Sequence, residues 1–404
     1  MNNILVEKRN ELLTLFTPGD GGEIPPYLAG REREKQFFRL AVYTLMEKHQ
    51  GNQNMIVYGP RGNGKTCLLE DLASKTRENY GDKIDILSVT PDEITTPEML
   101  EFWINTHEKP IMPVAETAEV KAGLPGFAGG VGVTFRQPGG VVTAIRKRCK
   151  DHHPVIMIVD EAHTLEDEVT RALFNASQTV RKENNPFFLV LAGTPGLLRT
   201  LGQANASFWE RGEEFPLGRL SVEESVEALV KPLEPFGIPF ANGVAEDVAI
   251  RAHCYPFFLQ VWGRCLVEEL VNRGRTTIDQ YTVIHAEPKV IVRRNQMYAK
   301  RFNEIDDREL LPVAGKLARA FIANDNKPIP TPEINKLVGE REIVKTLDRL
   351  GYIWQLPVVA KGEKLSYEPG IPSMMNFVKE QTVGLVPLEK TKEIEPERDI
   401  GLDY

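Results

Sequence analysis

Short, almost wholly apolar segments alternate with amphipathic segments over the first half of the chain. The apolar segments predict strands at residues 55–59, 84–90, 154–160, 187–192 and near 213–217. The amphipathic segments predict helices at residues 25–48, 64–79, 97–106, 140–151 and 166–182. Strands without polar alternation are typical of a parallel sheet buried on both faces. The pattern therefore predicts an α/β fold with helices on both sides of a parallel sheet.

The second half of the chain loses the strand pattern. Four amphipathic segments predict a helical lid over residues 221–304, with helices at 221–234, 243–252, 255–273 and 277–303. Residues 305–380 then predict three helices followed by a hairpin from Gly351 to Tyr367. The second helix has Thr331 as N-cap and Pro332 at its first position, and the third helix spans 340–350. This is the order of a winged-helix domain.

The remaining segments complete the predicted division into domains. Residues 1–24 form a polar leader, and residues 25–220 form the sheet-containing core. A Gly-, Pro- and Val-rich stretch at 110–140 predicts a loop or hairpin inserted into that core. Residues 381–404 are rich in Glu, Lys and Pro, which predicts a disordered acidic tail.

Composition narrows the class of protein. The net charge of -8 and pI near 5.6 argue against a protein that coats nucleic acid through bulk charge. The four cysteines form no C-x-x-C pair and predict reduced thiols without a disulfide or zinc framework. No uncharged apolar run approaches the ~18 to 20 residues that span a bilayer. We therefore expect a cytoplasmic protein of two or three domains with no membrane partner.

Residues 59–66 match the phosphate-binding pattern G-x-x-x-x-G-K-[ST]. They follow the apolar segment 55–58 and precede a helix, which is the context that the pattern requires. Backbone N–H groups of such a loop surround phosphates, while Lys65 reaches the β- and γ-phosphates and Thr66 ligates Mg²⁺. The motif therefore predicts ATP and Mg²⁺ as cofactors. The predicted nucleotide contacts are Gly59, Pro60, Arg61, Gly62, Asn63, Gly64, Lys65, Thr66 and Cys67.

A second apolar strand ends in two acids, Asp160 and Glu161. Next to a phosphate-binding loop, this pair predicts a hydrolytic site. Asp160 would hold Mg²⁺ through water, and Glu161 would polarise the attacking water. His163 has no metal-ligand spacing with other His or Cys residues, so we expect it to support the acids.

With these motifs, residues 26–380 resemble the AAA+ ATPases, and within them the branch of origin-recognition-type initiators, transposition helpers and archaeal-type STAND ATPases. In this branch the segment 26–32 resembles an element near the adenine, which implies a role for Arg31. The strand 189–196 resembles sensor 1, with Thr194 reading the γ-phosphate or its water. Segment 252–260 resembles a lid motif that places Pro256 against the nucleotide, although Cys254 replaces its glycine.

The resemblance also implies an arginine finger, which would complete the site of a neighbouring subunit in an ATP-dependent homo-oligomer. Arg211 precedes the strand-like segment 214–217 and is the first candidate. Arg199 and Arg219 are the alternatives. No arginine directly follows Pro256, so the initiator-type sensor-2 arginine is absent there, and Arg264 is the candidate substitute.

Three functions are compatible with this pattern. The first is an ATP-hydrolysing AAA+/STAND switch that recruits a partner protein through its winged helix. The second is a DNA-associated ATPase that binds duplex through the same domain. Candidate basic patches for duplex are residues 146–150, residues 289–301, and the third winged helix with Arg341, Lys345 and Arg349. Acids on that helix, including Asp348, nearly cancel its charge, which favours the switch. The third function, a non-catalytic scaffold, is disfavoured by the intact motifs.

Overall fold

Five strands form a wholly parallel sheet in the order β2-β3-β4-β1-β5. The computed structural model describes residues 8–19, 24–106, 140–204, 211–305, 309–356 and 365–384. The strands are β1 (Met55–Tyr58), β2 (Asp85–Val89), β3 (Val155–Val159), β4 (Phe187–Gly193) and β5 (Glu213–Pro216). The predicted α/β fold with a parallel sheet is therefore confirmed.

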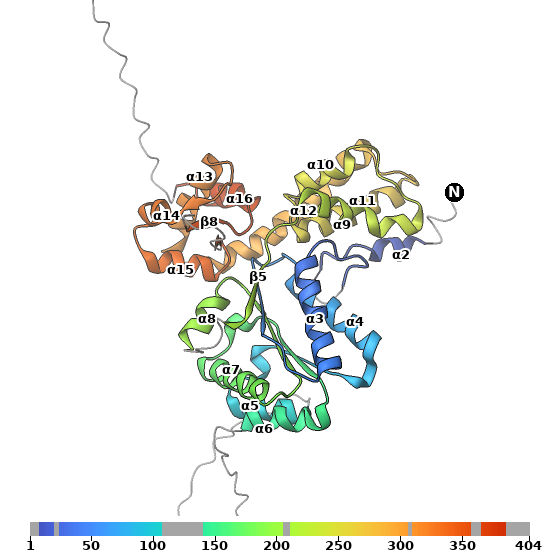
Figure 1. Cartoon of the computed structure of the whole chain (residues 1–404). Coiled ribbons are helices and arrows are strands. Elements are labelled where there is room, and N and C mark those ends of the chain that lie inside the picture. The colour runs from blue at the N-terminus through green and yellow to red at the C-terminus, as the bar shows by residue number, and fades with distance from the viewer. Residues whose placement is uncertain are drawn as a thin grey trace, which may run out of the picture.

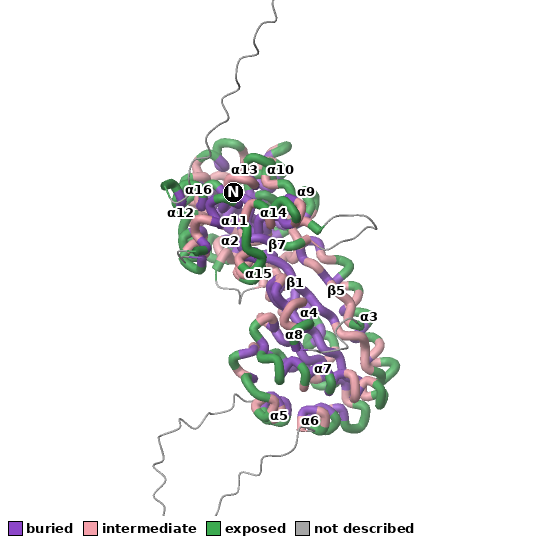
Figure 2. The backbone as a smooth tube through the Cα atoms, turned by 90° about the vertical axis from the view of Figure 1, so that its left-hand side faces the viewer, coloured by how far each residue is buried: buried purple, intermediate pink, exposed green. Residues whose placement is uncertain are grey.

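Helices cover both faces of this sheet, which explains why its strands are apolar throughout. Alternate residues of β1 enter two different cores: Met55 and Val57 face α3 and α4, whereas Ile56 and Tyr58 face α5 to α8. Figure 2 shows the strands as the buried centre of this layer. The helices are α3 (Glu32–Lys48), α4 (Lys65–Tyr80), α5 (Pro97–Thr106), α6 (Gly140–Arg148), α7 (Asp167–Lys182) and α8 (Leu197–Gln203).

The first core helix begins at Glu32 and not at residue 25, because Gly30 and Arg31 both have positive φ and cannot continue a right-handed helix. The predicted insertion at 110–140 lies almost wholly outside the described residues, and Gly140 is already the first residue of α6.

Four helices form a second, helical unit beside the core: α9 (Val222–Val230), α10 (Val244–Arg251), α11 (Pro256–Asn272) and α12 (Gln280–Glu304). The segment expected to be a polar leader belongs to this unit, because α2 (Arg9–Thr14) brings Leu12 and Phe16 into its core. Phe16 packs directly on Gly263 of α11, where a larger residue would collide with its ring. The prediction of a separate leader over residues 1–24 was therefore wrong for this part.

The C-terminal unit combines helices with a small antiparallel sheet in the order β6-β8-β7. Its elements are α13 (Leu310–Ala323), β6 (Ile329–Pro330), α14 (Thr331–Val338), α15 (Arg341–Arg349), β7 (Ile353–Gln355), β8 (Ser366–Pro369) and α16 (Met374–Gln381). Thr331 is the first residue of α14 and not its N-cap; its hydroxyl donates to the carbonyl of Leu365 instead. The sequence pattern did not predict α16.

The helical and C-terminal units share one continuous apolar cluster. It runs along α12 through Val283, Val290 and Tyr298 and continues into α13 and α16. Figure 1 shows α12 crossing from one unit to the other. No helix in the described part of the chain is long and apolar enough to cross a membrane. The predicted tail lies outside the described residues from residue 385 onward.

Candidate nucleotide-binding site

The phosphate-binding loop joins the carboxyl end of β1 to the first turn of α4. Gly59 lies so close to the carbonyl of Leu217 that an added Cβ would be 2.3 Å from its oxygen. Gly64 caps α4 with φ of 81°, a conformation that residues with a Cβ rarely adopt. These two constraints explain why glycine stands at both ends of the loop.

Lys65 is drawn back into its own loop. It is 6% exposed, and its ammonium group donates to the carbonyl oxygens of Gly59 and Pro60 at 3.0 and 3.1 Å. Burial lowers the pKa of Lys65 to about 8, although the carboxylates of Glu161 and Asp160 oppose that effect. A polyphosphate in the loop would supply the negative charge that the two neutral carbonyls lack.

Thr66 and Asp160 meet at the start of α4. The Thr66 hydroxyl donates to Asp160 Oδ2 at 2.6 Å, and Asp160 Oδ1 accepts the backbone N–H of Glu161 at 2.8 Å. The structure thus brings together the two residues expected to hold Mg²⁺. A hydroxyl and a carboxylate are the oxygen ligands that this cation prefers, so the donor set fits it.

Glu161 stands at the end of β3 with one unsatisfied oxygen. Its Oε2 is buried and accepts no hydrogen bond, although His163 Nδ1 lies 3.3 Å away. That ring nitrogen accepts the backbone N–H of Thr194 at 3.4 Å, and burial and the charges of Arg61 and Lys65 lower the pKa of His163 to about 4. The contact between His163 and Glu161 is therefore not an ion pair at neutral pH, because the imidazole is uncharged. Oε2 of Glu161 thus remains free to accept a proton from water.

Thr194 lies behind this acid and not on the cavity wall. Its side chain is fully buried, and its Oγ1 has no hydrogen-bond partner. His163 separates it from Glu161 and binds both Thr194 and, through its carbonyl, the hydroxyl of Thr200. The expected contact of Thr194 with a γ-phosphate would therefore need a shift of this segment or a bridging water.

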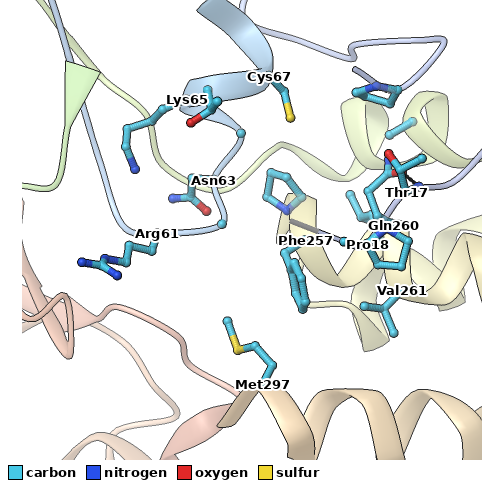
Figure 3. A pocket seen from close by; sticks show the side chains of 18 of the residues that line it. Thr17, Pro18, Arg61, Asn63, Lys65, Cys67, Phe257, Gln260, Val261 and Met297 are labelled. Atoms are coloured by element: carbon cyan, nitrogen blue, oxygen red, sulfur yellow. Dashed lines mark hydrogen bonds between the residues drawn. The ribbon is translucent and has the colours of Figure 1, made fainter. Parts of the chain in front are cut away.

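A cavity of about 1050 Å³ opens between the loop and the helical unit. Figure 3 shows Arg61, Asn63 and Lys65 on one side of it, and Phe257, Gln260 and Val261 on the other. Its described lining includes the predicted contacts Arg31, Arg61, Gly62, Asn63, Gly64, Lys65, Thr66, Cys67, Glu161 and Pro256. Arg61 Nε and Asn63 Oδ1 are buried there without a partner. The polar groups and the volume both fit a nucleoside triphosphate.

Arg31 connects the phosphate-binding loop to the segment that follows β5. It donates to the carbonyl oxygens of Asn63 at 3.3 Å and Gly218 at 2.6 Å, and burial lowers the pKa of its guanidinium. The residue therefore ties the loop to the segment after β5, in addition to lining the cavity. Sequence reasoning placed Arg31 near the base, and this bracing contact was not anticipated.

The first turn of α11 binds the loop directly. Phe257 donates its backbone N–H to the carbonyl of Gly62 at 3.2 Å, and the Tyr255 hydroxyl donates to the carbonyl of Arg61. Pro256 lies between these two contacts and lines the cavity. Sequence reasoning found Pro256 through its resemblance to a lid motif but assigned no role to Tyr255 of the same segment.

Two further residues at the cavity come from the last turn of α12; sequence reasoning had assigned Arg301 only to a candidate patch for duplex and had given Glu304 no role. Glu304 pairs with Arg301 at 2.6 Å and with Arg61 of the loop at 3.8 Å. Both α12 residues line the cavity. Their sequence pattern is that of a charged helix face, which gives no signal for a place at the nucleotide cavity. Arg264, the expected substitute for a sensor-2 arginine, pairs with Glu268 and does not line the cavity.

The three finger candidates have different environments. Arg211 is exposed just before β5 and is not among the residues that line the cavity. Arg199 and Arg219 instead bind the C-terminal unit, through Asp348 and Glu368. Both alternatives are therefore engaged within the chain. The assignment of the finger to Arg211 stays a prediction from the sequence.

Comparison with known families agrees with this geometry. Residues 48–201 match the family model described as an AAA domain. The matched segment begins before β1 and ends within α8, so it contains the loop, both acids and Thr194. No curated protein matches the sequence. The strand order, the loop and this match together support the P-loop AAA+ fold for the core.

Solved structures extend the likeness beyond the core. The chain is similar to the ORC2 protein of Aeropyrum pernix, solved as ADPNP-ADP complexes, with 14% identity and a TM-score of 0.54 over 90% of this chain and 97% of that chain. It is more weakly similar to the Holliday junction branch migration motor RuvB of Thermotoga maritima, with 16% identity and a TM-score of 0.46 over 83% and 93%. The Aeropyrum pernix ORC1 protein in complex with DNA gives 18% identity and a TM-score of 0.44 over 89% and 94%. At these identities the likeness to ORC2 concerns the fold alone.

Proposed function

We propose that this protein is an AAA+ switch that binds and hydrolyses ATP and changes the position of its C-terminal unit with nucleotide state. The unpartnered Arg61 Nε, Asn63 Oδ1 and Glu161 Oε2 around one cavity support the nucleotide part of the proposal. Lys65 and the backbone of the loop would bind the phosphates, and Arg31 would hold the loop in place.

The residues of this site suggest a division of the hydrolytic work. Thr66 and Asp160 would hold Mg²⁺, which when bound neutralises charge on the phosphates. Glu161 would accept a proton from the attacking water as a general base, because its Oε2 has no competing donor. His163 would stay neutral at physiological pH and position both Glu161 and the backbone of Thr194.

The switch part of the proposal rests on how the C-terminal unit docks onto the core. Arg199 of α8 pairs with Asp348 at 3.7 Å and donates to the carbonyl of Lys345 at 3.3 Å. Arg219, just after β5, pairs with Glu368 of β8 at 3.1 Å. Burial raises the pKa of both carboxyls, to about 6 for Asp348. These two ion pairs hold α15 and β8 against the nucleotide-binding end of the sheet.

The docking surface is connected to the phosphate-binding loop. Trp354 of β7 packs against Gly218, whose carbonyl accepts a hydrogen bond from Arg31. Arg31 in turn donates to the carbonyl of Asn63 in the loop. A change in the loop on nucleotide binding would therefore reach the C-terminal unit through two residues.

Duplex binding is the alternative function, and the charges of the described residues weigh against it. We assign the C-terminal unit to the winged-helix type from its helices and three-stranded sheet. Asp348 of α15 faces the core, and Arg349 passes Gly196 with its Cγ while the residue itself stays exposed. Acids pair with many of the remaining candidate cations, among them Arg146, Arg148, Lys289, Arg293, Arg301 and Lys345. A partner protein is thus the ligand that we assign to this unit.

Breaking the docking contacts tests the switch. We expect the double variant Arg199→Ala/Arg219→Ala to release the C-terminal unit, which increases the radius of gyration measured by X-ray scattering and changes basal ATP turnover. The matched control is Arg171→Ala, an exposed arginine of α7 without a described partner. An unchanged radius and turnover in the double variant would contradict the switch. Submicromolar, ATP-dependent duplex binding by the released protein would favour the DNA-associated alternative instead.

Replacing Arg211 tests the proposed homo-oligomer. If this arginine reaches a neighbouring subunit, Arg211→Ala should leave ATP affinity nearly intact and lower kcat on the order of 10³-fold. Wild-type turnover per subunit should also rise with protein concentration. Mixing Arg211→Ala with Lys65→Ala subunits should restore part of the activity at mixed junctions. Full turnover by a strictly monomeric protein would remove Arg211 from the mechanism.

A further inference from the structure

A second cavity, of about 230 Å³, lies between the helical and C-terminal units. Its walls come from four segments that are distant in sequence: the turn at His253, the middle of α12, the turn at Asn326 and one face of α16. Tyr298 and Phe377 form an aromatic wall, with ring centroids 5.7 Å apart. None of the residues assigned to the nucleotide site lines this cavity.

Polar side chains without partners gather around it. Within the described part of the chain, no hydrogen bond or ion pair engages the side chains of His253, Arg294, Asn295, Asn326, Asn376 or Glu380. His253, Asn295, Asn376 and Glu380 are exposed, whereas Arg294 and Asn326 are half-buried, and Arg294 Nε and Asn326 Oδ1 are closed off from water. Buried polar atoms in folded proteins are nearly always paired, so two such atoms in one cavity indicate an additional bound group.

Donors dominate this set, and the buried acceptor among them, Asn326 Oδ1, requires an O–H group of the ligand, such as a protonated phosphate oxygen or a sugar hydroxyl. Arg294 offers a planar guanidinium whose described contact is the face of Tyr298, at 5.7 Å. Asn295, Asn326 and Asn376 add amide donors, and the Ser373 hydroxyl is free to donate because its oxygen accepts from Tyr298. A phosphate group has enough oxygens to accept from several of these donors at once, and guanidinium is its preferred partner. Glu380 is exposed at the mouth, where it would contact the part of the ligand that bears hydroxyls.

We propose that this cavity is a second ligand site, for a small phosphate-bearing molecule, and that its occupancy alters nucleotide binding. The volume is too small for a second nucleoside triphosphate and is sufficient for free phosphate or a small sugar phosphate. The binding part of this proposal is independent of the proposed function. The coupling part rests on nucleotide binding at the loop.

The coupling has a continuous structural basis. Tyr298, which forms the wall of the second cavity, contacts Phe258 at 5.8 Å between ring centroids, and Phe258 contacts Phe257 at 5.3 Å. Phe257 lines the nucleotide cavity and donates its N–H to Gly62. On the backbone, His253 lies two residues before Tyr255, whose hydroxyl binds the loop. A group held by Arg294 and His253 would thus restrict the segment that contacts the loop.

Phosphate binding to the Lys65→Ala full-length protein tests the site without interference from the loop. Titration of inorganic phosphate by calorimetry at constant ionic strength should give saturable binding in that background. Adding Arg294→Gln should weaken it about tenfold or more, because a charge-assisted hydrogen bond is lost. Arg171→Gln, an exposed control of equal charge change, should leave it unchanged. Absence of saturable binding, or equal binding with Arg294→Gln, overturns the site.

Further measurements keep the test decisive if Arg294→Gln fails to fold. Asn376 is exposed, so the Asn376→Asp protein should fold. The new carboxylate should repel the phosphate and weaken its binding several-fold. Unchanged phosphate binding overturns the proposal. Ribose 5-phosphate binding more tightly than inorganic phosphate identifies a sugar phosphate as the ligand, and equal binding identifies free phosphate. Acetate binding as tightly as phosphate overturns the assignment to phosphate.

The coupling is measured in the protein with an intact loop. Ribose 5-phosphate should change the ADP affinity of wild type several-fold, and ADP should change the ribose 5-phosphate affinity by the same factor. Arg294→Gln should abolish this mutual effect while leaving ADP affinity itself intact. Loss of ADP binding in all proteins would contradict the proposed function, whereas intact ADP binding without a mutual effect would contradict the coupling.

Discussion

Lys65→Ala should lower ATP affinity roughly a hundredfold or more, which corresponds to the loss of about 3 kcal/mol of charge-assisted contacts to phosphate. The reason lies in the position of the side chain. Its ammonium group is buried beside the loop carbonyls and faces the space that the phosphates would fill. Equilibrium binding of a fluorescent ATP analogue measures the effect.

Lys83→Ala is the matched control for this variant. Lys83 is an exposed lysine without a described partner, and its removal changes the net charge by the same amount. We expect its ATP affinity to equal that of wild type. Thermal unfolding without nucleotide should be similar in both variants, since the two hydrogen bonds of Lys65 to carbonyls compensate for burying its charge. Unchanged ATP binding by a folded Lys65→Ala protein would remove the loop from nucleotide recognition.

Glu161→Gln should separate binding from hydrolysis. The amide keeps the volume of the carboxylate but cannot accept a proton, so kcat should fall by roughly 10² to 10⁴-fold, the usual contribution of a general base. ATP affinity should change little, because Lys65 and the loop backbone remain. Single-turnover hydrolysis and nucleotide binding, measured on the same preparation, distinguish the two effects.

The control for the second variant is Glu168→Gln, at an exposed acid in the first turn of α7. It should hydrolyse ATP like wild type. If Glu161→Gln also retained the wild-type rate, another group would have to activate the water. In that case the unpartnered Oε2 of Glu161 would need a different explanation.

The core of the fold could be predicted because its signals are local. Residues 155–159 are aliphatic at every position, and such a strand is stable only when both faces of its sheet are covered. The start of α3 was misplaced because two consecutive left-handed residues, Gly30 and Arg31, end the extended segment there. Arginine is rarely left-handed, so composition gave no warning.

The site was predictable to the extent that its chemistry resides in contiguous motifs. The contact between Thr66 and Asp160 follows from two motifs at the ends of parallel strands and was expected. The contact between Tyr255 and Arg61 joins segments separated by 194 residues and depends on how the helical unit packs. The pairing of Glu304 with Arg61 has the same origin. Such contacts arise from tertiary packing, which the local pattern around either residue does not contain.

The shared apolar cluster along α12 has a mechanical consequence. A helix with 25 residues is about 37 Å long at a rise of 1.5 Å per residue, and here both of its ends are packed into the same core. The helical and C-terminal units should therefore move together as a single arm. A rotation of a few degrees at the loop would become a displacement of several ångströms at the far end of the arm.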